Sequence, residues 1–325
     1  MTTTPFITRA MLLEHLTVQS SVEALRSALH EGVANAGAPA TQAVRGGTLR
    51  VAHAEGLGYA GTQLSGAAER AFPGRERVSG SYVLMDGETL APLAILDGPA
   101  LSEVRACAAA ALAADALAPH AASRLVVVGA GPLARTVIAA MRRVRPIQHV
   151  VIAGRSGAEA EGVAAFAAEC GMQARVSEAM SLHVAVPQAD VVVVTDAGEP
   201  PRFPAGIVAD GACVVAIGEP GGPGTGLDPE LLRTAVVAVD DASAAAEAGD
   251  VRAAIEAGAV AEGSLVPIGE LVLGRRAPSR TAPNVYVSVG SAWQDLAIAV
   301  LARRTVPSQR RKYVPGTAAQ AQRYL

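Results

Sequence analysis

The chain has 325 residues, half of them hydrophobic but only 3% aromatic, and its formal net charge is -3. This length allows two ordinary domains, and a near-neutral charge argues against nucleic acid or an anionic membrane as a partner. No apolar run approaches the roughly 20 residues that span a bilayer, and the first residues lack a basic start followed by a long apolar stretch. We therefore expect a cytoplasmic protein.

The first 45 residues or so are predicted to form helices. Residues 20–36 carry four apolar side chains at helical spacing, namely Val22, Leu25, Leu29 and Val33. A short strand is expected at residues 48–53. Residues 54–80 are rich in Gly and polar residues, and their pattern leads to no assignment.

A hairpin and a long helix are expected next. The hairpin covers residues 81–96 and turns at Asp86, Gly87 and Glu88. The helix is Ala-rich, covers residues 101–117 and ends before Pro119.

From residue 124 onward, short apolar strands alternate with helices. The expected strands are 124–128, 149–153, 173–176, 190–195, 212–218, 235–240 and 285–289, and the expected helices are 132–144, 158–170 and 291–304. Continuous Val-rich strands are typical of a parallel sheet covered by helices on both faces. The predicted fold class is therefore α/β, with a Rossmann-type doubly wound parallel sheet. The tail after Thr305 is basic and polar.

A glycine-rich turn joins the first of these strands to its helix. Its residues fit the pattern G-x-G-x-x-A and are Gly129, Ala130, Gly131, Pro132, Leu133 and Ala134. The first Gly permits a tight turn, the second lets the backbone approach a pyrophosphate, and Ala allows close packing of helix on strand. The helix start offers N–H groups and a positive dipole end, and Pro suits its first turn. The turn predicts a dinucleotide site; a glycine turn without a ligand is the alternative.

The end of the following strand bears on the choice of cofactor. NAD-preferring domains usually carry Asp or Glu there, whereas this chain has Arg155 and Ser156 after Gly154. An Arg fork matches a 2′-phosphate, and a Ser hydroxyl can add a hydrogen bond. We expect NADPH or NADP⁺, with NADH less favoured. The alternative is a solvated Arg in a protein that accepts either cofactor.

Other residues follow strands at the same edge of the sheet. Ligands of open α/β sheets bind in the crevice outside the carboxyl ends of the strands. Cofactor contacts are therefore expected from Thr195, Ile217, Gly218, Ser288 and Gly290. For each of them, plain turn geometry is the alternative.

An ordered set of motifs precedes and follows the glycine turn. The run YVLMDGETLAPLAILDGPALSEVRA leads into RLVVVGAGPLA, and further motifs are LRVAH near Arg50, GLDPELL at 226–232, EAGD at 247–250 and NVYVSVGSAWQDLAIA at 284–299. This arrangement resembles the ornithine cyclodeaminase and mu-crystallin family, whose hairpin, D-x-x-T-G-x-P-L-A-x-x-D-G, precedes a helix with L-T-x-x-R-T-A-A and a GAG turn. The resemblance covers residues from about 48 to 302.

The resemblance implies a two-domain organisation. Residues 1–118, completed by 300–325, would form an α+β substrate-binding and dimerisation domain, and residues 119–299 would form the NAD(P)-binding Rossmann domain. The active site would lie in the cleft between them, and the protein would be a homodimer. Known activities of the family include cyclodeamination, ketimine reduction, amino-acid dehydrogenation and cleavage of amino-acid adducts. They share hydride transfer between a nicotinamide and the Cα of an amino or imino acid.

Two arginines match family positions that clamp the substrate carboxylate. They are Arg105, in LSEVRA, and Arg50, in LRVAH. A guanidinium can hold a carboxylate through two parallel hydrogen bonds, which would orient the substrate. An interdomain ion pair is the alternative for each.

Two positions depart from the family pattern. Gln63 stands where the family has an essential Lys, and it can form hydrogen bonds but cannot transfer a proton near pH 7. Pro220, next to Glu219, stands where the cyclodeaminases have an Asp that manages protons. Both departures disfavour cyclodeaminase chemistry. His53 is one candidate proton donor, although its spacing from Arg50 on a strand would place the two on opposite faces.

The leading hypothesis is an NADPH-dependent reductase of imines formed from a 2-oxo acid or related carbonyl compound, or an amino-acid dehydrogenase. Arg50 and Arg105 would orient the carboxylate, and Gln63, Glu219 and His53 complete the candidate catalytic residues. The alternatives are an ornithine or lysine cyclodeaminase-type lyase, an adduct-cleaving dehydrogenase, and a non-catalytic NADPH-binding protein of the mu-crystallin type.

Overall fold

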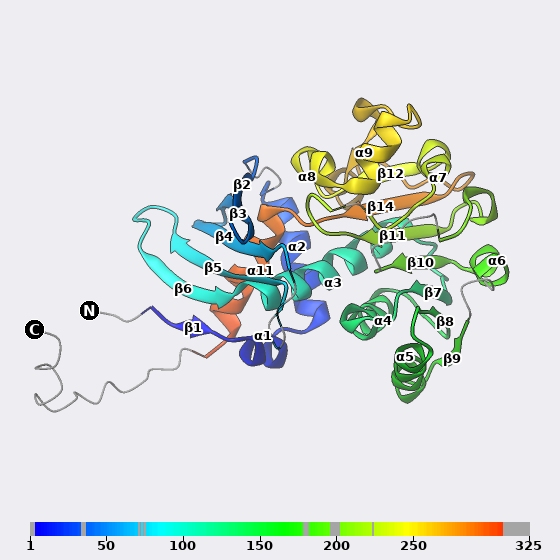
Figure 1. The fold of residues 1–325 in the computed structure, drawn as a ribbon, viewed down its shortest axis with the longest axis horizontal. Helices are drawn as coiled ribbons and strands as arrows, with labels where there is room; N and C mark the ends of the chain where they lie inside the picture. The colour runs from blue at the N-terminus through cyan, green and yellow to red at the C-terminus, as the bar shows by residue number, and fades with distance from the viewer. Residues whose placement is uncertain are drawn as a thin grey trace, which may run out of the picture.

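The chain folds around two β-sheets that lie side by side (Figure 1). The computed structural model describes residues 4–33, 37–70, 72, 74, 76–177, 182–195, 202–222 and 224–307. The first sheet has six strands in the order β1-β6-β5-β4-β3-β2, and the second has eight in the order β13-β12-β14-β11-β10-β7-β8-β9.

The six-stranded sheet comes from the amino-terminal third of the chain. In it β1 runs parallel to β6, and every other neighbouring pair is antiparallel. The elements of this region are β1 (Phe6–Ile7), α1 (Arg9–His15), α2 (Val18–His30), β2 (Ala40–Val44), β3 (Gly47–Gly56), β4 (Tyr59–Ala68), β5 (Val78–Asp86), β6 (Pro92–Asp97) and α3 (Gly98–Leu117).

The structure corrects part of what was expected for this region. Residues 1–45 are not all helical, because β1 and β2 are strands, and the helix expected at 20–36 covers Val18–His30. The unassigned residues 54–80 hold the end of β3, all of β4 and the start of β5. All five residues of β2 are exposed, so the strand lacks the alternation of apolar and polar residues that marks a half-buried strand.

The hairpin between β5 and β6 confirms the predicted turn at Asp86. Its Oδ1 accepts hydrogen bonds from the backbone N–H of Glu88 (3.2 Å) and from the N–H (2.9 Å) and hydroxyl (2.8 Å) of Thr89. These bonds, above all the one from the Thr89 backbone, lower the pKa of Asp86 below its ordinary value. The long helix that follows starts earlier than expected, because Asp97 caps its amino end by accepting from the Ala100 N–H at 3.0 Å.

The eight-stranded sheet is parallel throughout, as the Val-rich pattern predicted. Its strands are β7 (Arg124–Val128), β8 (His149–Ala153), β9 (Gln173–Val176), β10 (Val191–Val194), β11 (Cys213–Ile217), β12 (Val236–Val239), β13 (Val266–Pro267) and β14 (Asn284–Ser288). The helices are α4 (Pro132–Val144), α5 (Gly157–Glu169), α6 (Leu182–Ala185), α7 (Pro229–Thr234), α8 (Ala242–Glu247), α9 (Gly249–Glu256), α10 (Ile268–Val272) and α11 (Ala292–Thr305). The sequence patterns had not indicated α6 to α10, which are short.

Two apolar clusters cover the two faces of this sheet. Val127 and Val193 belong to one cluster, and their neighbours Val126 and Val192 belong to the other. The first cluster is continuous with the core of the amino-terminal sheet, because α3 is buried along most of its length and contacts both sheets. Its alanines allow this close approach, so α3 joins the two halves.

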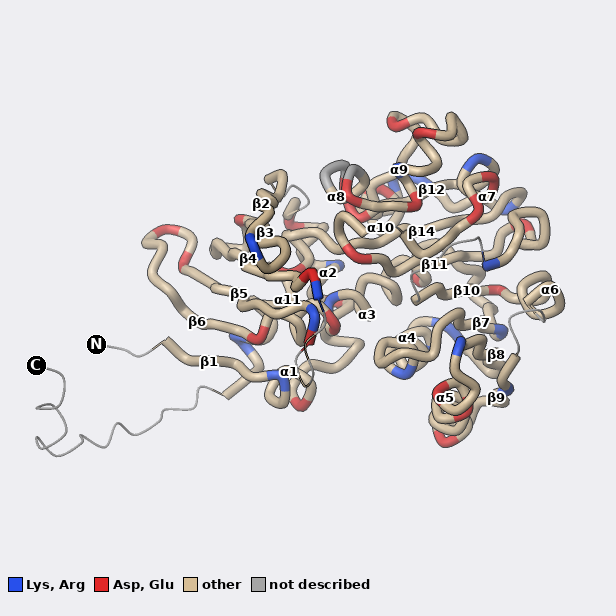
Figure 2. The backbone as a smooth tube through the Cα atoms, viewed as in Figure 1, with Lys and Arg blue, Asp and Glu red and all other residues tan. Residues whose placement is uncertain are grey.

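Charged residues show no separation between the halves. In Figure 2, basic and acidic positions are interspersed over both sheets of the described chain, in agreement with the formal net charge of -3. None of the described helices has both the length and the apolar character needed to cross a membrane.

A cavity in the parallel sheet should cost measurable stability. Val193 is fully buried in β10, so Val193→Ala removes buried methyl groups and should lower the free energy of unfolding by about 2 kcal/mol. Val184→Ala, at a side chain 59% exposed on α6, is the matched control and should change it by under about 0.5 kcal/mol. Chemical denaturation measures both, and equal effects would contradict the packing described.

Candidate functional site

The glycine turn after β7 has the shape expected of a dinucleotide site. Gly129 has a φ of 121°, which favours glycine, and its N–H donates to the Ala153 carbonyl at 2.7 Å. Gly131 caps α4 with no side-chain hydrogen bond, and a Cβ on Gly131 would meet no atom within 4 Å. The backbone at the start of α4 therefore faces open space, into which a pyrophosphate fits.

The turn packs directly against the end of β8. A Cβ on Gly154 would lie 2.7 Å from the Cβ of Ala130, so a side chain at 154 would push the turn away from the strand. Arg155 is exposed at this edge. Ser156 caps α5, its Oγ accepting from the Glu159 N–H at 3.4 Å. Arg155 and Ser156, the expected contacts of a 2′-phosphate, thus lie beside the glycine turn. The Ser156 hydroxyl oxygen already accepts the hydrogen bond that caps α5.

The other predicted cofactor contacts fall into two groups. Thr195 and Gly218 continue the parallel sheet at its carboxyl edge: the Thr195 N–H donates to Val128 at 2.9 Å and the Gly218 N–H to Ser288 at 2.8 Å. Ile217 ends β11 beside them, 8% exposed. In contrast, the Ser288 hydroxyl points into the protein. The loop after Ser288, which contains Gly290, packs against Arg105.

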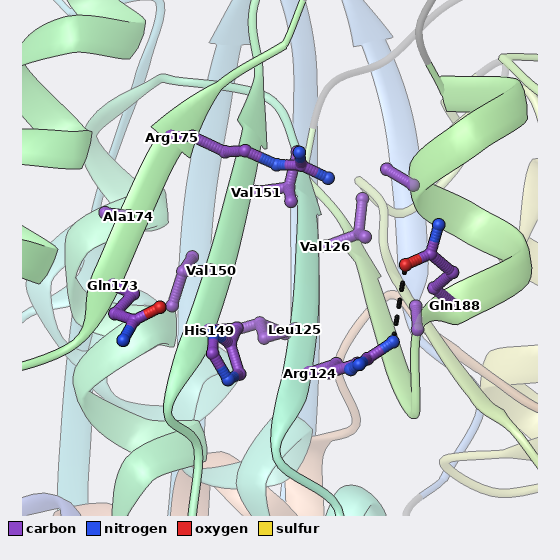
Figure 3. Close-up of a pocket in the computed structure, with 12 residues that line it drawn as sticks. Arg124, Leu125, Val126, His149, Val150, Val151, Gln173, Ala174, Arg175 and Gln188 are labelled. Carbon is purple, nitrogen blue, oxygen red and sulfur yellow. Dashed lines mark hydrogen bonds between the residues drawn. The ribbon is translucent and has the colours of Figure 1, made fainter.

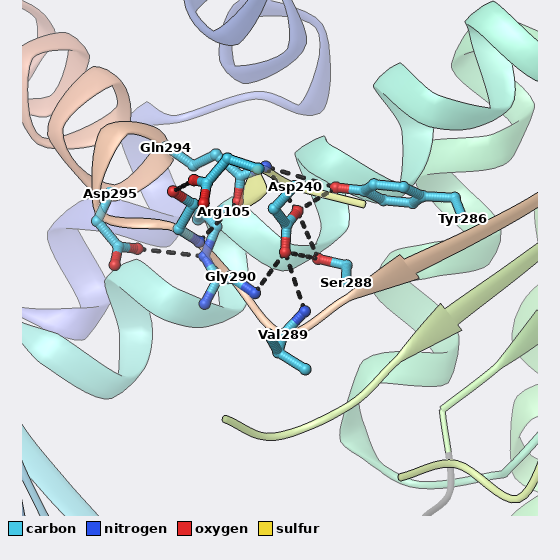
Figure 4. A network of polar contacts seen from close by, with 10 residues as sticks. Arg105, Asp240, Tyr286, Ser288, Val289, Gly290, Gln294 and Asp295 are labelled. Atoms are coloured by element: carbon cyan, nitrogen blue, oxygen red, sulfur yellow. Dashed lines mark hydrogen bonds and ion pairs between the residues drawn. The ribbon is translucent and has the colours of Figure 1, made fainter. Parts of the chain in front are cut away.

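A buried carboxylate that the sequence reasoning missed holds this loop (Figure 4). Asp240, 2% exposed at the end of β12, accepts hydrogen bonds from five groups. They are the Tyr286 hydroxyl, the Ser288 hydroxyl (3.0 Å), the Val289 N–H (3.0 Å), the Gly290 N–H (2.8 Å) and the Gln294 amide (2.9 Å). The available signal was a pair of Asp residues directly after an apolar strand, which suggests a polar role at the strand end.

The same loop holds Arg105 in place. The Nε of Arg105, on α3, donates to Asp295 Oδ1 of α11 at 3.2 Å. Gly290 has a φ of 87°, and a Cβ there would lie 2.3 Å from the Arg105 guanidinium carbon, so only glycine fits beside it. Burial raises the pKa of Asp295, and Arg105 opposes that shift.

The terminal nitrogens of Arg105 are uncommitted. Nη1 and Nη2 form no hydrogen bond or ion pair with any residue in the part of the chain described, since the only such contact of this side chain is made by Nε. Arg105 is 8% exposed. This guanidinium is nearly buried and is held through Nε, so its two terminal nitrogens, Nη1 and Nη2, form an unused fork. Such a fork is suited to bind a carboxylate through two hydrogen bonds.

Arg50 forms an ion pair between the two halves of the molecule. Its Nη2 donates to Glu247 Oε2 at 2.7 Å, from β3 to the end of α8. Its Nε is buried and has no hydrogen-bond partner among the residues that the structure describes. The structure therefore places both arginines near the junction of the halves. Arg50 makes the interdomain ion pair that the sequence left open as the alternative, whereas the pair of Arg105 with Asp295 joins α3 to α11, which packs in the same half.

Gln63 lies on the inner face of the amino-terminal sheet, opposite Tyr82 in the register of β4 and β5. Gln63 is 6% exposed, and neither its Oε1 nor the Tyr82 hydroxyl has a hydrogen-bond partner among the described residues. Burial, and secondarily the charge of Asp295, raises the pKa of Tyr82 well above its ordinary value. Tyr82 and Asp295 are thus buried polar groups that the sequence analysis did not single out, and Asp295 is the one that contacts Arg105.

Two predicted catalytic residues lie apart from the arginines. His53 is exposed on β3, while its neighbours Ala52 and Ala54 are buried. This places His53 on the outer face of the sheet, as its spacing from Arg50 indicated. Glu219 is exposed in the loop after β11. No contact in the described structure joins either residue to Arg105 or Gln63.

A cavity of about 410 Å³ lies at the opposite edge of the parallel sheet (Figure 3). Arg124, His149 and Gln173, which begin β7, β8 and β9, line it, and Arg124 bonds to Gln188 across it at 3.3 Å. None of the predicted site residues lines this cavity. Since cofactors of such sheets bind at the carboxyl ends of the strands, it is not the candidate site.

Comparisons with known proteins agree with this geometry. The sequence pattern that defines the ornithine cyclodeaminase/mu-crystallin family matches residues 7–309 of this chain. Alanine dehydrogenase from Archaeoglobus fulgidus is 30% identical over 260 residues, 78% of this chain and 79% of the relative. A Delta(1)-pyrroline-2-carboxylate reductase from Bacillus cereus is 27% identical over 252 residues, 76% of this chain and 77% of the relative. A solved archaeal alanine dehydrogenase dimer with bound NAD superimposes with a TM-score of 0.86 at 27% identity, covering 93% of this chain and 95% of that one.

The open space at Gly131 provides a direct test of the cofactor site. Gly131→Ala should leave the unfolding temperature unchanged, since the new methyl group meets no protein atom. It should weaken NADPH binding at least tenfold, because the methyl group would stand where the pyrophosphate approaches the backbone. Gly206→Ala, also in open space, is the control. NADPH fluorescence titration measures both, and unchanged affinity in Gly131→Ala would place the cofactor elsewhere.

Proposed function

The chain belongs to the ornithine cyclodeaminase/mu-crystallin family, and we propose that it is an NADPH-dependent imine reductase or amino-acid dehydrogenase. Hydride would pass between the nicotinamide and the Cα of an imino or amino acid, in a biosynthetic pathway. The observation that carries this proposal is the unused fork of Arg105 beside the carboxyl edge of the Rossmann sheet. Relatives named alanine dehydrogenase and Delta(1)-pyrroline-2-carboxylate reductase support it.

Arg105 would hold the substrate carboxylate. Nη1 and Nη2 can donate two parallel hydrogen bonds, while Asp295 on Nε keeps the guanidinium in one orientation. Holding the carboxylate at two points orients the Cα to which it is attached. The buried position of Arg105 would exclude water from this end of the substrate.

Gln63 would contact the nitrogen of the substrate. Its Oε1 is a buried acceptor that no described residue contacts by a hydrogen bond, and such an acceptor is satisfied by an N–H of an amine or iminium. When bound, the cofactor supplies or accepts the hydride. Gln63 would position the C–N bond for that transfer without taking part in proton transfer itself.

The residues that would hold the cofactor surround the glycine turn. Gly129, Ala130, Gly131, Pro132 and Leu133 would bind the pyrophosphate at the start of α4. Arg155 and the hydroxyl hydrogen of Ser156 would bind a 2′-phosphate, which favours NADPH over NADH. Thr195, Ile217 and Gly218 lie on the same edge and would line the nicotinamide half of the cofactor.

The two halves of the fold would have different functions. Residues 1–118, completed by 300–325, would bind substrate and form the dimer, and residues 119–299 would bind the cofactor. All of α11 (Ala292–Thr305) packs on α2, α3 and the amino-terminal sheet. Leu49 and Leu64 are 42% and 50% exposed on the outer face of that sheet, so this apolar face would form a homodimer contact.

A non-catalytic NADPH-binding protein is the second candidate. Gln63 and Pro220 occupy two positions where the resemblance leads one to expect ionisable side chains, and a binding protein could keep the turn while losing them. Both departures also disfavour a cyclodeaminase.

An absorbance assay at the nicotinamide band, with a panel of imines and amino acids, separates the candidates: tight NADPH binding without turnover favours the binding protein. Ammonia release from ornithine or lysine would support the lyase.

Replacing Arg155 tests the cofactor preference. Arg155→Asp removes the proposed 2′-phosphate partner and introduces repulsion, so NADPH affinity should fall at least tenfold while NADH affinity is kept or improves. Arg142→Asp, at an exposed position of α4, makes the same charge change as a control. Titration with both cofactors measures the ratio, and an unchanged ratio would refute the role of Arg155.

Replacing Arg105 tests the carboxylate clamp. Arg105→Lys keeps the charge but loses the planar fork, so kcat/KM for an imino acid should fall about 100-fold, or about 3 kcal/mol. NADPH affinity should stay unchanged. Arg9→Lys, in the surface ion pair with Glu103, is the control. Steady-state kinetics measure the effect, and activity close to that of the wild type would show that Arg105 has only a structural role.

A further inference from the structure

The ion pair between Arg50 and Glu247 joins the two halves of the molecule. Arg50 lies on β3 and Glu247 at the end of α8, with Nη2 and Oε2 2.7 Å apart and each side chain 21% exposed. They line a cavity of about 10 Å³ together with Gly290, which packs against Arg105. That volume is about enough for one water molecule. The cavity is therefore too small to hold an amino or imino acid beside Arg50.

The contact leaves Arg50 incompletely satisfied. Within the described part of the chain, Arg50 donates to Glu247 through Nη2 alone, and its Nε, which lies on the same edge of the guanidinium, is buried without a partner. An unpaired donor on a charged group carries a desolvation penalty. A carboxylate bound to Nε and Nη2 together would remove the penalty, because two parallel hydrogen bonds are the preferred geometry of an Arg–carboxylate pair. Arg50 is therefore better suited to an incoming carboxylate than to Glu247.

The backbone of Glu247 is fixed, so its side chain would have to move. Its carbonyl accepts from the Gly221 N–H at 3.0 Å and from Arg252 Nη1 at 3.2 Å, which ties the end of α8 to the loop after β11. At the start of α8, Asp241 accepts from the Ala244 N–H at 2.9 Å. With both ends of this short helix held, rotation of the Glu247 side chain is the simplest way to release Arg50.

We propose that Glu247 is a specificity-determining residue that occupies Arg50 until the carboxylate of the substrate displaces it. This inference rests on the proposed function. Arg105 offers its fork in the structure described, whereas Arg50 becomes available only by exchange of one carboxylate for another. A ligand that carries a carboxylate gains the bidentate contact with Arg50, and a ligand without one leaves the pair closed. The exchange thus selects for ligands that carry a carboxylate.

The experiment compares ligand binding to the wild type and Glu247→Gln, both saturated with NADP⁺. Glutamine keeps the size of the side chain but competes weakly for a guanidinium, so L-proline should bind about tenfold more tightly to the variant. L-prolinamide, which has no carboxylate, should bind equally to both proteins. Glu256→Gln, at an exposed position on the neighbouring α9, is the charge-matched control and should behave like the wild type. Isothermal titration calorimetry measures each affinity.

The variants are first checked by thermal unfolding, and Glu247→Ala serves as a second variant with the same expected gain. Weaker or equal L-proline binding in both Glu247 variants, no measurable binding by any protein, or an equal gain for L-prolinamide would overturn the proposal. A failure of the proposed function is distinguishable, because it would appear as a wild type that does not bind NADPH or does not turn over any imine or amino acid.

Discussion

The hydrogen bonds that converge on Asp240 determine the geometry of the candidate site. Its carboxylate binds the end of β14 and the start of α11 at once, and so joins the parallel sheet to a helix that packs in the other half of the molecule. A buried carboxylate is stable only when donors surround it, and here five groups supply them. Because this network fixes Gly290 and the first turn of α11, it also fixes Asp295 and, through it, Arg105.

The two arginines at the junction are both balanced by acids, but differently. Arg105 is held through Nε, which keeps its outer fork open and its orientation constant. Arg50 is held through Nη2, the nitrogen that a ligand would also need. The contact with Asp295 therefore orients Arg105 for binding a ligand, whereas the contact with Glu247 blocks a nitrogen of Arg50 that a ligand would need. A site arranged in this way would bind a carboxylate without carrying a large net positive charge.

The parallel sheet and its glycine turn could be predicted because their signals are local. The run Val191–Val194 has no polar residue, and the order of strand, glycine turn and helix lies within one short segment. In the amino-terminal sheet, β2 is wholly exposed and β4 contains Gly61 and Gly66, so neither shows a clear alternation. Asp240 and Asp295 escaped notice because their partners are distant in sequence: Asp240 bonds to Ser288 and Asp295 to Arg105.

By itself, the sequence determined the fold class and the position of the dinucleotide turn, since each depends on residue type and short-range order. The two arginines and the departures at Gln63 and Pro220 came from the resemblance to the family, which rests on the order of its motifs along the chain. Only the tertiary structure decided what these groups can do. It showed that the fork of Arg105 has no partner among the described residues, that Arg50 is paired with Glu247, and that His53 lies on the outer face of its sheet. The physical reason is that hydrogen bonds and ion pairs depend on distances between side chains brought together by folding, which spacing along a chain does not specify.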